Sequence, residues 1–185
     1  MEWIKYVAMS AIVVMCVACG GQSEEKGTIE ERAFQSKIDV RTGVTRMQHS
    51  EAHGNVVMGG AEYHYAVNRV PCDSLPKVKD ERGNLFVDNY IDLKITRNGN
   101  QKVLAKRFTK QTFAGQVDQK FLSKAILEGL VFDKEEHGKL IFAASVCYPQ
   151  TDLFIPLKVT VSPNGAMHME RATMVEDEVP QGANE

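Results

Sequence analysis

The stretch that decides the fold is YIDLKITRNGNQKVLAKRF, residues 90–108. Its first half alternates the apolar residues Ile91, Leu93 and Ile95 with polar ones, which is the period of a strand that buries one face. The Asn-Gly pair at 98–99 favours the primed turns that match the twist of two paired strands. The stretch therefore predicts an antiparallel hairpin that contributes one face to a hydrophobic core.

Similar alternation predicts strands elsewhere in the chain. A second hairpin is expected from strands at 153–161 and 166–175, and Pro156 inside the first of them indicates a sheet edge or a bulge. Three more strands are predicted at 37–46, 56–70 and 139–147. Gly59-Gly60 is expected to interrupt the strand at 56–70 with a bend or bulge.

One segment, residues 118–128, has apolar residues at helical spacing. Asp118 can cap its start, and Gly129 lies just past its end. These elements predict a mainly β fold: an antiparallel sheet or sandwich built of hairpins, with one short helix. An α+β arrangement stays open as the alternative.

The N-terminus has the layout of a lipoprotein signal peptide at residues 1–18. Lys5 precedes an apolar run of about a dozen residues, whereas a bilayer-spanning helix needs roughly 20. The segment Cys16-Val17-Ala18-Cys19-Gly20 resembles a lipobox, although Cys16 stands where an aliphatic residue is usual. We therefore predict lipidation of Cys19. The alternatives are an uncleaved anchor and an ordinary signal peptide cleaved near Ala18, which leaves Cys19 as a free thiol.

The mature chain divides into three parts by composition. Residues 19–36 are polar and predict a flexible tether, 37–175 a single antiparallel β-rich domain, and 176–185 a disordered acidic tail. In the tether, Ser23-Glu24-Glu25 is either a solvated linker or an export signal of the kind that Bacteroidota lipoproteins of the outer cell surface carry. The predicted location is the cell envelope, with a lipid anchor in the outer membrane, and the cell surface if this tract is an export signal.

Charge and motifs exclude several functions. The formal net charge is -2, with both signs spread along the chain, so a nucleic-acid partner is not predicted. Phosphate-binding loops and dinucleotide fingerprints are missing, and no cofactor is predicted.

Cys72 and Cys147 could pair, because an exported protein meets an oxidising compartment. Alternatively, Cys147 is a small buried hydrophobe in its apolar surroundings.

The histidines give the strongest hint of chemistry. His49 and His53 are four residues apart, a spacing that could bind zinc on a helix. However, Gly54 and flanking strands predict a loop, so we predict no metal site. Ser145 lacks the glycines of a nucleophile elbow, and we predict no catalytic residue. A rival hypothesis is an envelope hydrolase whose site brings together His49, His53, His64 and a carboxylate.

The long connection at 69–90 is either an irregular crossover or a binding loop. Together with 106–110, 127–133 and 142–152, it resembles an uncharacterised family of lipoproteins from gut and oral Bacteroidota, over roughly 37–175. The resemblance implies an envelope lipoprotein domain and no assigned activity.

The favoured function is thus a non-enzymatic module that binds a glycan, peptide or protein partner through a sheet face or this connection. A deep pocket that gathers the histidines would favour the hydrolase instead.

Overall fold

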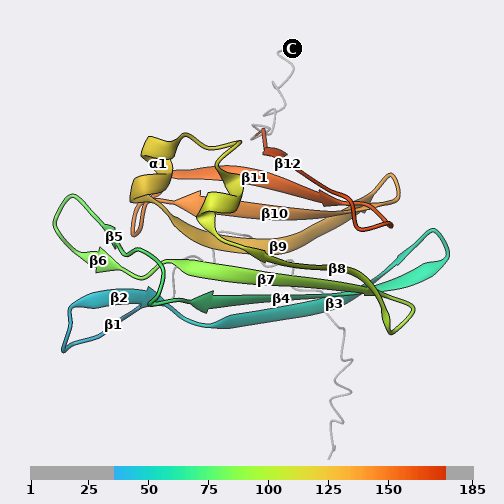
Figure 1. The fold of residues 1–185 in the computed structure, drawn as a ribbon, viewed down its shortest axis with the longest axis horizontal. Coiled ribbons are helices and arrows are strands. Elements are labelled where there is room, and N and C mark those ends of the chain that lie inside the picture. Colours follow the sequence, from blue (N-terminus) through green and yellow to red (C-terminus); the bar gives the residue numbers. More distant parts are fainter. Residues whose placement is uncertain (1–35, 174–185) are drawn as a thin grey trace, which may run out of the picture. The chain divides into compact units, whose positions relative to one another are not determined.

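The computed structural model describes residues 36–173, which form two large antiparallel sheets and one small sheet (Figure 1). The first large sheet has the strand order β3-β4-β7-β8, and the second has the order β12-β11-β10-β9. The first comprises β3 (Ser50–Met58), β4 (Ala61–Pro71), β7 (Asn89–Arg97) and β8 (Gln101–Phe108). The second comprises β9 (Ile126–Glu136), β10 (Lys139–Cys147), β11 (Phe154–Val161) and β12 (Met167–Arg171).

The two large sheets pack face to face around a shared core, so the prediction of a mainly β, antiparallel fold made of hairpins is confirmed (Figure 1). Ile91, Leu93 and Ile95 of β7 are fully buried in this core. Across the sheets, the ring of Tyr65 stacks on Phe132 with centroids 4.8 Å apart. Full burial of an aliphatic side chain such as Ile91 stabilises the fold by about 1.5–3 kcal/mol.

The small sheet has the order β1-β2-β6-β5. It consists of β1 (Ser36–Ile38), β2 (Val44–Met47), β6 (Leu85–Phe86) and β5 (Val78–Lys79). The β2–β6 pair is parallel. A second apolar cluster joins this sheet to β9 and β10, and its members are Met47, Val78, Phe86, Ile126 and Cys147.

A helical crossover leads from β8 in the first sheet to β9 in the second. It contains a 3-10 helix, η2 (Lys110–Phe113), and the short helix α1 (Gln119–Lys124). The Asp118 carboxylate caps α1 by accepting a hydrogen bond of 2.7 Å from the backbone N–H of Lys120. Within residues 36–173, no helix is long and apolar enough to cross a membrane.

A buried ion pair ties this crossover to the core. The Lys110 Nζ lies 3.2 Å from Asp88 Oδ2, and the two residues are 7% and 1% exposed. Lys110 also donates to the carbonyl oxygen of Ala125 at 2.8 Å, and Asp88 Oδ1 accepts from the N–H of Leu127 at 2.9 Å. The pair therefore fixes η2, the start of β7 and the start of β9 to one another.

Two of the predicted strands are split by turns. The strand predicted at 37–46 is two strands, β1 and β2, because the chain turns between them at Gly43, whose φ is 65°. In the strand predicted at 56–70, Gly59-Gly60 is a hairpin turn between β3 and β4 and not a bulge within one strand. Both glycines have positive φ, 57° and 75°, which suits such a turn.

The helix predicted at 118–128 ends at Lys124, and β9 begins at Ile126, so a strand was missed there. The prediction of an edge or bulge at Pro156 is also wrong. β11 is an inner strand, and its pairing with β10 is continuous at that position. The Pro156 carbonyl accepts a hydrogen bond from the N–H of Ala172, so the backbone polar groups of Pro156 face β12. The β11–β12 ladder ends at this position, and the missing proline N–H therefore costs no hydrogen bond to β10.

Candidate binding groove

The described part of the chain has an open groove of about 490 Å³, a volume in the usual range for small-ligand sites. Three segments far apart in the sequence form it: the β5–β6 hairpin, the end of α1, and the loop between β10 and β11. The lining residues are Lys79, Asp80, Glu81, Arg82, Lys124, Tyr148, Pro149, Gln150, Thr151 and Leu153.

The β5–β6 hairpin forms one wall, and its turn is held by the Asp80 carboxylate. Asp80 Oδ1 accepts from the backbone N–H groups of Arg82 at 2.9 Å and Asn84 at 2.7 Å, and Oδ2 accepts from the Asn84 side-chain amide at 2.8 Å. Gly83 completes the turn with a φ of 91°. Both Asp80 oxygens are thus used as acceptors in the turn, while its negative charge remains in the groove lining.

The loop between β10 and β11 forms the opposite wall and is also internally bonded. The N–H of Tyr148 donates to the carbonyl of Leu153 at 2.9 Å, and the N–H of Leu153 donates to Thr151 Oγ1 at 3.2 Å. From α1, the Phe121 ring stacks on the Tyr148 ring with centroids 4.5 Å apart. Both walls are therefore preformed, which lowers the entropy cost of binding.

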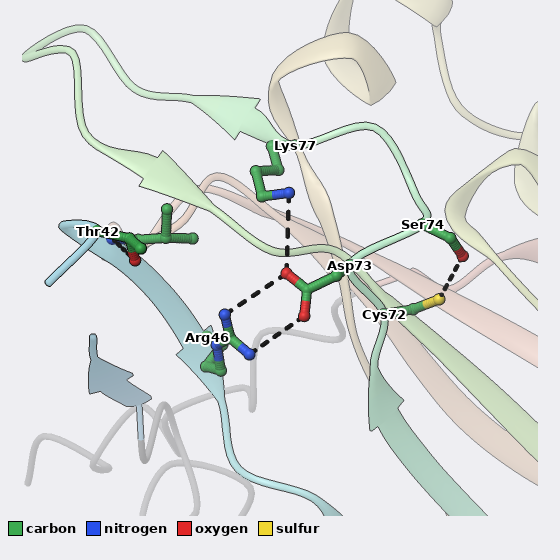
Figure 2. A network of polar contacts seen from close by, with 7 residues as sticks. Thr42, Arg46, Cys72, Asp73, Ser74 and Lys77 are labelled. Atoms are coloured by element: carbon green, nitrogen blue, oxygen red, sulfur yellow. Dashed lines mark hydrogen bonds and ion pairs between the residues drawn. The ribbon is translucent and has the colours of Figure 1, made fainter.

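A surface ion-pair network holds the chain segment that leads into β5. Figure 2 shows Asp73 between Arg46 of β2 and Lys77, at N–O distances of 3.2 Å and 3.7 Å. Exposed pairs of this kind contribute roughly 0–1 kcal/mol each, so the network orients the segment more than it stabilises the fold.

The groove lining contains three cationic side chains, two carboxylates and several apolar side chains. Lys79, Arg82 and Lys124 form no ion pair with any residue between 36 and 173, and Glu81 is the acidic lining residue that the turn does not use. Beside them, Leu153 is 52% exposed, and the neighbouring Phe154 is 40% exposed. This combination suits a ligand with negative charge and an apolar part.

The histidines of the rival hypothesis lie elsewhere, on the outer face of the first sheet. The His53 and His64 ring centroids are 6.2 Å apart, and His64 Nδ1 is 2.8 Å from Asn55 Oδ1. His49 Nε2 is instead 2.6 Å from Asn68 Oδ1. His53 is part of strand β3, so the loop predicted around it is wrong.

A shallow depression of about 230 Å³ on that face includes His53 but neither of the other two histidines. The deep pocket that the hydrolase hypothesis requires is therefore not formed by His49, His53 and His64. Among residues 36–173, no group of three His, Cys, Asp or Glu side chains is placed to hold a metal ion.

The two cysteines of the domain are unpaired in the structure. Cys147 is buried in the cluster with Met47, and burial, together with the nearby Glu128, raises the pKa of its thiol well above the usual range. Cys72 is partly exposed, and its Sγ lies 3.0 Å from Ser74 Oγ (Figure 2), a hydrogen bond that lowers its pKa.

Sequence reasoning missed the groove, although it offered the 69–90 connection as a binding loop. This connection contains β5 and β6, and its turn supplies Lys79 and Arg82. The other wall comes from residues 148–153, at the junction of two predicted strands. The clustered charges at 77–82 were the one signal that could have directed attention there.

The fold and the groove define an antiparallel β-sandwich with a preformed, cation-rimmed hollow. A family model described as a domain of unknown function, DUF4738, matches residues 28–169, so the chain belongs to this family. A search of curated proteins gave no match. The expectation of an uncharacterised family is thus confirmed, whereas lipidation and the bacterial group stay predictions. Family membership assigns no activity, and function has to be argued from the groove.

Proposed function

We propose that this protein is a lipid-anchored envelope module that binds a partner in the groove between the β5–β6 hairpin and the β10–β11 loop. The observation that carries the proposal is the presence of three cations without ion pairs, Lys79, Arg82 and Lys124, beside Tyr148 and Leu153 in one preformed groove. Such a site binds through charge-assisted hydrogen bonds and apolar contact. The partner is a glycan, a peptide or a protein segment that carries negative charge.

The envelope location is part of the same proposal and rests on the N-terminal sequence. The lipobox-like segment that ends at Cys19 supports lipidation, and the acidic Ser23-Glu24-Glu25 tract supports export to the outer face of the outer membrane. Two or three acyl chains hold a protein firmly to a membrane, whereas one binds weakly.

The groove is tested with the Cys19→Ala protein on an array of glycans and peptides that carry carboxylate, sulfate or phosphate groups. We expect retention of a subset of these ligands. Replacing Arg82 and Lys124 by Gln should weaken binding by about tenfold or more, because a hydrogen bond to a charged group contributes about 1.5–3 kcal/mol.

The matched control is Lys106→Gln, which removes an exposed cation of β8 that does not line the groove. Binding that falls equally in the control and the double variant, or no retained ligand at all, would contradict the proposal.

A further inference from the structure

We propose that the acidic segment Glu176-Asp177-Glu178 of this same chain occupies the groove and competes with the outside partner. The inference rests on the groove being the binding site, and it adds how that site is regulated.

The chain leaves β12 next to the strand that starts at the groove. β12 runs antiparallel to β11, with Val161 opposite Met167 and Leu157 opposite Arg171. One step further, the N–H of Ala172 donates to the carbonyl of Pro156 at 3.0 Å. The ladder ends there, because Leu157 and Arg171 are its last pair. Leu153, which lines the groove, lies three residues before Pro156 along the chain.

The residues that follow match the groove in order. Met174 and Val175 are apolar, as are the exposed side chains of Leu153 and Phe154. The three carboxylates of Glu176, Asp177 and Glu178 come next in the sequence. Lys79, Arg82 and Lys124 line the groove and form no ion pair among residues 36–173.

Tethering makes even a weak contact effective. A residue of extended chain spans about 3.3 Å, so the acidic segment starts within a few residues of the groove. A short flexible connection gives an effective concentration on the order of millimolar. A segment that would bind weakly as a free peptide therefore occupies the groove for much of the time and excludes partners that do not bind more tightly.

The proposal also defines the chemical class of the partner. A partner that displaces the segment has to bind the groove more tightly than the segment does, and an extended acidic peptide with apolar residues before its carboxylates offers the same chemistry. An uncharged glycan gains nothing from the three cations and would not displace the segment.

The test uses the Cys19→Ala full chain and the same chain with the neutralising changes E176Q, D177N and E178Q. The probe is a synthetic peptide that spans residues 174–185, and binding is measured by isothermal titration at low salt. We expect the neutralised chain to bind the peptide on the order of tenfold more tightly than the chain with the acidic segment. Outside the substituted segment itself, amide NMR shift differences between the two chains should be confined to residues around Arg82, Thr151 and Leu153.

A neutralised chain that also carries Arg82→Gln should lose the peptide, whereas Lys106→Gln should keep it. If both chains bind the peptide equally and their spectra agree around the groove, the segment does not occupy it, and the proposed function stands. If neither chain binds the peptide but the array of charged glycans and peptides retains ligands, competition by the acidic segment is also excluded. If the array retains none either, the groove is not a binding site and both proposals fail.

Discussion

Gly54 is the residue of the first sheet whose replacement the structure most directly forbids. It lies in β3 opposite Tyr65, and the Tyr65 ring crosses over it, so that a Cβ at position 54 would lie 2.5 Å from the phenolic oxygen. The ring cannot swing aside, because it stacks on Phe132 and meets the edge of Phe142.

We therefore expect Gly54→Ala to lower the free energy of unfolding by about 1–3 kcal/mol, the usual cost of overpacking. The measurement is urea denaturation followed by tyrosine fluorescence. Gly115→Ala is the control, since a Cβ there meets nothing within 4 Å. Equal stability of the two variants would show that the Tyr65 ring is not held as described.

The two thiols of the domain should differ in reactivity. The thiolate is the nucleophile, and the pKa of Cys72 is lowered by its hydrogen bond with Ser74, whereas burial raises that of Cys147. With the Cys19→Ala protein, iodoacetamide near neutral pH should label Cys72 in the native state and Cys147 only after unfolding, as read by peptide mass spectrometry. A disulfide between Cys72 and Cys147 in that experiment would contradict the structure.

At the scale of elements, the buried pair of Lys110 and Asp88 is the junction of η2, β7 and β9. Lys110→Met keeps the volume but leaves the Asp88 carboxylate buried without its cation. Removing one partner of a buried pair costs about 3–5 kcal/mol, so the denaturation midpoint should fall by a corresponding amount. Lys106→Met, at an exposed position of β8, should leave it nearly unchanged. A double variant with Asp88→Asn should recover part of the loss.

The hairpin at 90–108 could be predicted because local signals agree there. Alternation sets the buried face, and Asn98 and Gly99 adopt positive φ of 46° and 87° in the turn that the sequence indicates. Likewise, the strand at 139–147 was located correctly because its apolar residues are continuous and its ends are marked.

β9 could not be predicted because its start competes with a helical pattern. Ile126 follows Leu122 at helical spacing, and the strand ends in the charged residues Asp133 to Glu136, which have low strand propensity. Its pairing with β10 decides the outcome, and pairing is a tertiary interaction. The groove escaped prediction for the same reason: its walls are contributed by segments whose proximity only the fold creates.

At the scale of the whole molecule, attachment to the envelope is expected to depend on one atom, the sulfur of Cys19. Cys19→Ala should release the protein from the membrane fraction, because the acyl chains are the strong anchor that the sequence provides. Fractionation and labelling with an acyl probe measure this, with Cys16→Ala as the control that should stay bound. Full membrane retention of Cys19→Ala would exclude the lipoprotein proposal.

A separate prediction concerns the face of the outer membrane on which the protein lies. Replacing Glu24 and Glu25 by Ala should leave lipidation intact and reduce protease accessibility on intact cells, if the tract directs export. Replacing Glu30 and Glu31, further along the tether, is the matched control. Equal accessibility of all three proteins would assign the tract to a solvated linker.

Each large sheet is built from one stretch of the chain, the first from 50–108 and the second from 126–171. All their pairings except β4–β7, which spans β5 and β6, are closed over short loops, and this favours fast folding. Whenever the first sheet pairs before the second, its inner side chains, Ile91, Leu93 and Ile95 among them, face water without their cover. Until the C-terminal half of the chain packs against them, that surface is exposed to aggregation.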